Sequence, residues 1–213
     1  MLTIHHLGTS QSERIVWLCE ELGVPYELRH HARDPVTRLS PPALKELHPL
    51  GAAPVIEDGG RMLAESGAIV EYILEKHGGG RLKLGPADPA FADYLYWFHF
   101  ANANLQAVMG RLLYLQRAGV AEDNPVLTGT RGKLALLLGL MDERVARLPY
   151  LAGEAFTAAD VMTLFSLTTM RRFLPLDLAP YPGLRAYIQR LAARQAYQRA
   201  MAKADPGVAP LLD

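Results

Sequence analysis

Hydroxyl and amide side chains gather in one short stretch near the start of the chain, GTSQSER at Gly8 to Arg14. An apolar, loosely alternating segment, LTIHHL at Leu2 to Leu7, precedes it, and a helical pattern follows, so the stretch occupies a turn between a strand and a helix. A helix start presents unpaired backbone N–H groups and the positive end of the helix dipole. The turn therefore favours an anion such as a thiolate.

The same turn also has a purely structural interpretation. Ser10 and Glu13 have the spacing of a capping box, in which the serine accepts a hydrogen bond from the helix and the glutamate reaches back. Such a box stabilises the start of a helix and needs no ligand. From the residues alone, capping is preferred over catalysis.

Two further pairs of residues could bind a ligand. Ala53-Pro54 stands at the entry of a predicted strand, where a cis proline would present the preceding backbone to an extended ligand and a trans proline would simply start an edge strand. Glu65-Ser66 stands where an apolar helix begins. There Ser66 can cap the helix and bind a carboxylate, and Glu65 can receive an ammonium group, which together suit an α-amino-acid head group. The alternative is a serine cap beside a glutamate favoured by the helix dipole.

The elements that must position these residues alternate between strand and helix. After the strand at 2–7, apolar residues at helical spacing predict a helix from Ser12 that stops at Gly23. The order continues with a strand at 25–31, a short helix from Pro41, a hairpin around Gly59-Gly60 and a helix from Glu65 to about His77. This β-α-β-α-β-β-α order predicts a small α/β domain with a mixed sheet over residues 1–79.

Strand signals vanish beyond the linker at 77–89. Asp88-Pro89 and Asn124-Pro125 each place a capping residue before a first-turn proline, and Thr157 and Asp160 resemble a capping box. Residues 88–213 are therefore expected to form an all-helical domain.

Composition narrows the class of protein. Lys plus Arg and Asp plus Glu both total 22 in the 213 residues, so a nucleic acid or an anionic membrane is not an expected partner. Cys19 is the only cysteine, lies on the apolar face of the first helix, and is expected to pack in the core. No secretory leader, membrane span or metal-ligand spacing is apparent, which predicts a soluble cytoplasmic protein without a metal.

Three stretches together resemble the cytosolic glutathione transferase family along nearly the whole chain. They are SQSERIVWLCEELGVPYEL, HPLGAAPVIEDGGRMLAESGAIVEYILEKHG and YLAGEAFTAADVMTLFSL. The similarity is greatest to bacterial and fungal members with a serine-type active site. The resemblance implies a thioredoxin-like N-terminal domain that binds glutathione as co-substrate, an all-α C-terminal domain that lines the electrophile pocket, and a homodimer.

The resemblance also assigns roles to individual residues. Glu65 and Ser66 would hold the γ-glutamyl end of glutathione, with Gln11 as a further binding residue. Pro54 would be a cis proline, and the backbone of Ala53 would pair with the cysteinyl residue. The activating hydroxyl would come from Ser10 according to the local pattern, or from Thr9 if the chain is aligned backwards from Gly23.

One position departs from the family pattern. Many relatives carry a lysine near the glycyl carboxylate of glutathione, where this chain has Ala52. Arg38 or His48 could supply the missing cation.

Glutathione conjugation to small apolar electrophiles is the expected reaction. Glutathione-dependent peroxide or disulfide reduction, or a non-catalytic binding role, are the alternatives. The first long helix of the second domain offers aromatic and apolar candidates for the electrophile pocket, although such residues are more often core: Tyr96, Phe98, Phe100 and Met109.

Overall fold

The computed structural model describes residues 1–213, which divide into two compact units. The first unit comprises Met1–Lys83 together with Ala192–Pro210, and the second comprises Leu84–Leu191 together with Leu211–Asp213. The last helix therefore groups with the N-terminal part of the chain, whereas the sequence analysis placed all of 88–213 in one helical domain.

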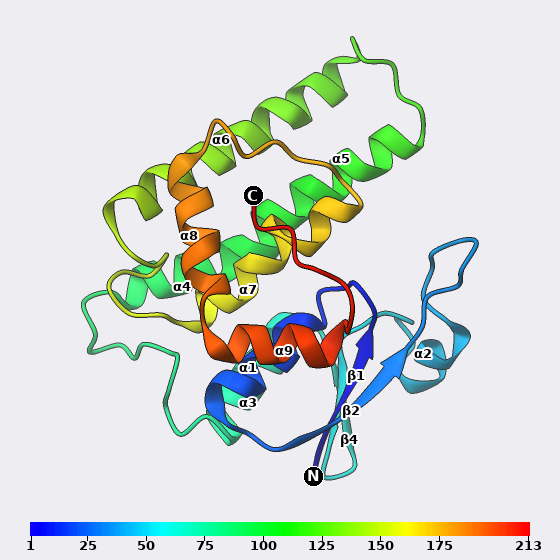
Figure 1. Ribbon diagram of the computed structural model, residues 1–213, viewed down its shortest axis with the longest axis vertical. Helices are drawn as coiled ribbons and strands as arrows, with labels where there is room; N and C mark the ends of the chain where they lie inside the picture. The colour runs from blue at the N-terminus through cyan, green and yellow to red at the C-terminus, as the bar shows by residue number, and fades with distance from the viewer. The chain divides into compact units, whose positions relative to one another are not determined.

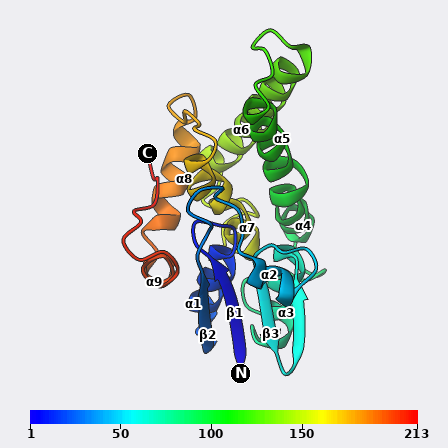
Figure 2. The same cartoon turned by 90° about the vertical axis from the view of Figure 1, so that its right-hand side faces the viewer.

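The first unit contains a four-stranded mixed sheet with the strand order β2-β1-β3-β4. Figure 1 shows this sheet, and Figure 2 shows β2, β1 and β3 side by side. β1 (Leu2–Leu7) pairs in parallel with β2 (Tyr26–His31) and antiparallel with β3 (Val55–Asp58), which forms a hairpin with β4 (Arg61–Ala64). Both residues of the hairpin turn, Gly59-Gly60, have positive φ, as a two-residue turn between twisted strands requires. The predicted mixed sheet and hairpin are confirmed.

Three helices alternate with these strands in the predicted order. α1 (Glu13–Leu22) follows β1, α2 (Pro42–Leu47) lies between β2 and β3, and α3 (Ser66–Lys76) follows β4. α1 ends at Gly23, which has a φ of +64° and adopts the left-handed conformation that lets the chain turn. The arrangement fits the expected thioredoxin-like domain.

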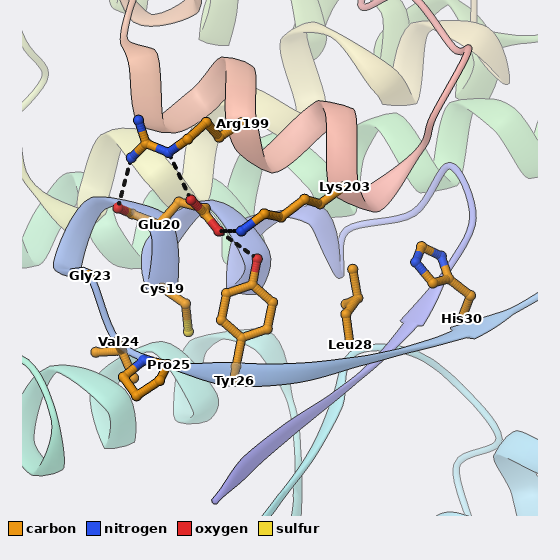
Figure 3. Close-up of a pocket in the computed structure, with 10 residues that line it drawn as sticks. All are labelled: Cys19, Glu20, Gly23, Val24, Pro25, Tyr26, Leu28, His30, Arg199 and Lys203. Atoms are coloured by element: carbon orange, nitrogen blue, oxygen red, sulfur yellow. Dashed lines mark hydrogen bonds and ion pairs between the residues drawn. The ribbon is translucent and has the colours of Figure 1, made fainter.

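The helix α9 (Gln195–Ala204) lies alongside α1 in both views of the molecule (Figures 1 and 2). Ion pairs hold the two helices together. Arg194 donates two hydrogen bonds to the carboxylate of Glu21, at 2.6 and 2.8 Å. Arg199 donates to the carboxylate of Glu20 at 2.9 Å, and Figure 3 shows Glu20 surrounded by its partners. These pairs explain why α9 belongs to the first unit.

The second unit is built from helices only, which confirms the predicted all-α domain. Its elements are α4 (Phe91–Phe100), a π-helical segment (Ala101–Gln106), α5 (Ala107–Arg117), α6 (Pro125–Arg147), α7 (Ala158–Leu167), a 3₁₀ turn (Thr169–Arg172) and α8 (Pro182–Ala192). Every residue of α7 is buried, as expected for a helix surrounded by others. None of the helices is both long and apolar enough to cross a membrane.

Two of the three predicted helix starts in this unit have the expected form. The Asn124 side chain accepts a first-turn N–H at 2.9 Å, and the Asp160 carboxylate accepts the Thr157 N–H at 2.8 Å in a capping box. α4 begins later than Asp88 and Pro89 suggested, at Phe91. The Asp88 carboxylate accepts the N–H of the residue before α4 at 2.8 Å, within a separate turn.

Candidate functional site

The turn between β1 and α1 holds both candidate hydroxyls, in different ways. Thr9 has a φ of +51°, which is uncommon for a non-glycine residue, and its hydroxyl donates to the carbonyl oxygen of Gly8 at 2.8 Å. Ser10 is buried, and its Oγ lies 2.7 Å from the Oγ of Ser12. Ser12 directly precedes the first residue of α1. The structure thus places Thr9 and Ser10 at the amino end of α1.

The capping box expected for Ser10 and Glu13 takes a different form. The N-cap residue is Ser12, whose side chain makes no capping hydrogen bond. Its Oγ accepts the N–H of Leu7 at 3.1 Å, so β1 holds this side chain instead of the helix. Ser10 Oγ accepts the N–H of Ser12 at 3.3 Å, and the Glu13 N–H donates to the backbone carbonyl of Ser10 at 3.1 Å.

A buried histidine and a buried aspartate stand behind these hydroxyls. Ser12 Oγ lies 2.8 Å from His6 Nδ1, and His6 Nε2 lies 3.4 Å from Asp205 Oδ2. Asp205 directly follows α9, and its Oδ1 accepts the N–H of Thr9 at 2.8 Å. Burial raises the pKa of Asp205, but His6 and the Thr9 N–H outweigh burial and hold this pKa below its ordinary value. Sequence analysis missed the pair because its members lie near opposite ends of the chain.

Arg14 brings together Gln11 and Ser66, which the sequence analysis found in separate stretches. Its Nη1 donates to Gln11 Oε1 at 2.9 Å and to Ser66 Oγ at 3.2 Å, while the Ser66 hydroxyl lies 3.4 Å from Gln11 Oε1. Arg14 is fully buried, and burial lowers its pKa to about 9. The stretch GTSQSER contains this arginine, but a charged residue beside a glutamate gave no reason to expect burial.

Glu65 and Ser66 lie at the start of α3. Glu65 occupies the N-cap position with a φ of +72°, and Ser66 is the first helical residue, not the cap that the sequence suggested. Strained backbone at a non-glycine residue is concentrated at functional sites. The backbone N–H groups of the first helical turn have no partner within the helix, so they suit a bound carboxylate.

The peptide bond between Ala53 and Pro54 is cis, as the resemblance implied. Ala53 is buried in a small apolar cluster with Leu7 and Leu44. Leu7 also donates its backbone N–H to Ser12 Oγ. The loop that contains Ala53 therefore adjoins the end of β1, next to the turn that carries the hydroxyls.

Lys45 lies close to the loop in which the chain has Ala52 in place of the family's lysine, and the sequence alone did not suggest it. Ala52 is exposed, and a β-carbon on its neighbour Gly51 would be 3.4 Å from the Cβ of Lys45. Lys45 is carried by α2. It therefore joins Arg38 and His48 as a candidate cation for this loop.

The first unit thus offers two helix starts that can hold anions and one carboxylate, Glu65, that can hold an ammonium group. Cys19 does not add a nucleophile, because it is fully buried and burial raises the pKa of its thiol to about 12. No three His, Cys, Asp or Glu side chains are arranged to hold a metal ion. The hydroxyls, backbone N–H groups and helix dipoles of this unit are groups that can bind anions.

In the second unit, three of the four candidate pocket residues belong to the core. Phe98, Phe100 and Met109 are buried. Tyr96 is 53 % exposed and lines a cavity of about 230 Å³ with Trp97 and residues of α6. Within this unit, Tyr96 is the one member of the set that a small molecule could reach.

Two families match the chain, one for each part. Residues 4–81 match the family described as the glutathione S-transferase N-terminal domain, and residues 106–195 match the corresponding C-terminal domain.

Individual relatives agree with these matches. Glutathione S-transferase 3 of Schizosaccharomyces pombe is 32% identical over 220 residues, covering 96% of this chain and 88% of the relative. Glutathione S-transferase 3 of Zea mays is 33% identical over 76% of this chain and 75% of its own length. Among solved structures, a glutathione S-transferase from Actinobacillus pleuropneumoniae has a TM-score of 0.88 and 28% identity, covering 97% of this chain and 95% of its own.

Proposed function

Because the chain belongs to the glutathione S-transferase family, we propose that it transfers the thiolate of glutathione to small apolar electrophiles as a serine-type member. The observation that carries the proposal is the position of Ser10, whose buried hydroxyl lies at the amino end of α1. In the same unit, the Ser66 hydroxyl is hydrogen-bonded to the side chain of Gln11. In the cell, this reaction would serve detoxification in the cytoplasm.

The sulfur of glutathione needs stabilisation as an anion. A thiol with a pKa near 8.5 is only a few per cent thiolate at pH 7, and lowering this pKa by about two units requires about 2.7 kcal/mol. One hydrogen bond from the Ser10 hydroxyl to the sulfur can contribute about 1.5–3 kcal/mol, and the start of α1 about 0.3–1 kcal/mol more. These two contributions suffice, and no general base is required.

The γ-glutamyl end of glutathione carries both a carboxylate and an ammonium group. In this proposal the carboxylate binds the Ser66 hydroxyl and the backbone N–H groups at the start of α3, and the ammonium group binds Glu65. Gln11 completes the site, and Arg14 fixes its amide through the 2.9 Å hydrogen bond.

The remaining part of glutathione would lie along the loop before β3. The backbone of Ala53 would pair with the cysteinyl residue in the manner of an added strand. The glycyl carboxylate would then lie near Ala52, and Lys45, whose Cβ would lie 3.4 Å from a β-carbon on Gly51, is a candidate cation for it.

A homodimer is a further part of the proposal. Large apolar side chains stay exposed on two helices of the second unit, namely Leu95 and Tyr96 on α4 and Leu136 and Leu140 on α6. Exposed apolar side chains on a helical surface favour association between copies. The molar mass in solution tests this part.

The experiment that tests the function replaces each hydroxyl in turn. Ser10→Ala should raise the pKa of the bound glutathione thiol by about one to two units, corresponding to the loss of about 1.5–3 kcal/mol, while the affinity for glutathione changes little. The thiolate absorbance as a function of pH measures this pKa. Loss of the thiolate signal in Thr9→Ala instead would move the assignment to Thr9.

Activity assays separate the alternative reactions. Retention on immobilised glutathione together with turnover of a chloronitrobenzene would support conjugation. Turnover of peroxides or disulfides without conjugation would favour glutathione-dependent reduction, and binding without either activity would favour a non-catalytic role.

A further inference from the structure

Four buried side chains form a continuous line behind the proposed activating hydroxyl. The distances are 2.7 Å from Ser10 Oγ to Ser12 Oγ, 2.8 Å from Ser12 Oγ to His6 Nδ1, and 3.4 Å from His6 Nε2 to Asp205 Oδ2. Exposure of the four residues ranges from 0% to 7%. His6 Nε2 and Asp205 Oδ2 have no hydrogen-bond partner by strict geometry, and they lie 3.4 Å from each other.

The direction of hydrogen bonding along this line decides what Ser10 can do. A hydroxyl has one proton and two lone pairs. If His6 Nδ1 carries a proton, Ser12 Oγ accepts from His6 and from the Leu7 N–H. Its own proton then goes to Ser10 Oγ at 2.7 Å or to the Leu7 carbonyl oxygen at 3.4 Å, and the shorter contact favours Ser10. Ser10 Oγ then accepts from the hydroxyl and the N–H of Ser12, and only its proton is left for a ligand.

The opposite direction would disable Ser10 as a donor. If His6 Nδ1 lacks a proton, it accepts from the Ser12 hydroxyl. Ser12 Oγ then accepts the Leu7 N–H and the proton of Ser10. Ser10 would present only lone pairs to a bound sulfur, which would repel a thiolate.

Asp205 influences which direction is stable, because its carboxylate faces the other ring nitrogen of His6. A carboxylate only accepts hydrogen bonds, so the Nε2 atom of His6 that faces it must carry a proton. Two states of the ring meet this requirement: a neutral one in which Nδ1 accepts from Ser12, and a cationic one in which Nδ1 donates to Ser12. The adjacent carboxylate favours the cation, since an opposite charge at short range stabilises it. Other charged or titratable groups nearby are Arg33, which interacts with Asp205, His31, which interacts with His6, and His30, whose ring packs edge-on against His6 with 5.6 Å between the ring centroids.

We propose that Asp205 and His6 are positioning residues, which form an imidazolium–carboxylate pair and thereby direct the Ser10 hydroxyl proton toward the sulfur of bound glutathione. The proposal rests on the proposed function, since it needs Ser10 to be the activating hydroxyl. It gives α9 a part in the reaction: the helix brings the carboxylate that orients a hydroxyl at the other end of the chain.

The protonation state of His6 can be observed directly. Nitrogen-15 NMR of the imidazole rings, with His6 assigned from the spectrum of His6→Gln, should show both ring nitrogens of His6 protonated at neutral pH in the protein saturated with S-methylglutathione. An unprotonated Nδ1 in this complex would overturn the proposal. The result does not depend on whether Ser10 activates the thiol.

Asp205→Asn tests the consequence for the sulfur. The amide keeps an acceptor for the Thr9 N–H but cannot balance a cationic His6, so the pKa of the bound glutathione thiol should rise by about one unit, which lowers the thiolate population about tenfold at pH values well below this pKa. The affinity for S-methylglutathione, which has no thiol, should stay within about twofold. A purely structural role would change both quantities.

Asp58→Asn is the matched control, since Asp58 is a buried aspartate of the same unit that is also paired with a histidine, His77, at 2.8 Å. It should leave the thiol pKa unchanged. If Ser10→Ala raises the thiol pKa and Asp205→Asn does not, the positioning role is wrong and the proposed function stands. If Ser10→Ala itself leaves the thiol pKa unchanged, the proposed role of Ser10 fails and the positioning role fails with it.

Discussion

Replacement of Arg14 by methionine should weaken glutathione binding without changing the reactivity of the bound thiol. Methionine keeps the length and apolar stem of the side chain but removes the donor that joins Gln11 to Ser66 at 2.9 and 3.2 Å. Hydrogen bonds that involve a charged group contribute about 1.5–3 kcal/mol, so the Kd for glutathione should rise by about 10- to 150-fold if the γ-glutamyl site depends on them.

The effect on stability should be small. Arg14 is fully buried, and burial lowers the pKa of its guanidinium to about 9, which shows that the protein interior disfavours the charge. Replacing a buried charge by an apolar residue of similar volume is often neutral or stabilising. The free energy of unfolding of Arg14→Met should therefore change by less than about 2 kcal/mol, because removal of the buried charge offsets the loss of its hydrogen bonds.

Titration calorimetry with glutathione measures the Kd, and the thiolate absorbance measures the thiol pKa. Arg81→Met is the control, because Arg81 is a part-buried arginine of the same unit that donates to backbone carbonyls away from the site. An unchanged Kd in a folded Arg14→Met protein would refute the reasoning. So would a raised thiol pKa, because Arg14 would then act on the sulfur and not on the γ-glutamyl end.

Two further predictions concern other parts of the first unit. Ala52→Lys should tighten glutathione binding by about tenfold, because it adds a charge-assisted hydrogen bond to the glycyl carboxylate. In calorimetry, Ala52→Met should bind glutathione no more tightly than the wild-type protein, and Ala52→Lys should show no gain with a glycyl ester of glutathione. Hydrogen bonds from Lys76 and His77 lower the pKa of Asp58 to about 2, so its contribution to stability is present above about pH 4 and is lost progressively as the pH falls through about 2. Denaturant unfolding of Asp58→Asn should therefore show about 1–2 kcal/mol less stability than the wild-type protein near neutral pH, and a difference that vanishes at about pH 1. An equal difference at both pH values would contradict this.

Local signals in the sequence were enough to predict most elements of the fold. Gly23 stops α1, and Gly59-Gly60 turns β3 into β4, because few residues other than glycine adopt positive φ easily. Asn124 and the Thr157–Asp160 capping box mark helix starts through hydrogen bonds within one turn. Such interactions join residues close in sequence, so their patterns are readable without a structure.

The parts that sequence analysis missed depend on contacts between distant residues. The burial of Arg14 involves a hydrogen bond to Ser66, which lies 52 residues further along the chain. The shift of the N-cap from Ser10 to Ser12 follows from a hydrogen bond with β1. His6 meets Asp205 only because α9 packs on α1. No periodicity or spacing along the chain encodes these pairings.

The packing of α9 on α1 also has a consequence for biosynthesis. A ribosome makes the four strands and first three helices early, yet the carboxylate that accepts the Thr9 N–H is residue 205 of the 213. Folding of the N-terminal region during translation can therefore produce the sheet but not the finished turn, which waits until the helical unit has been synthesised. The turn that carries Thr9 and Ser10 should therefore gain its last hydrogen bond only after residue 205 has been synthesised.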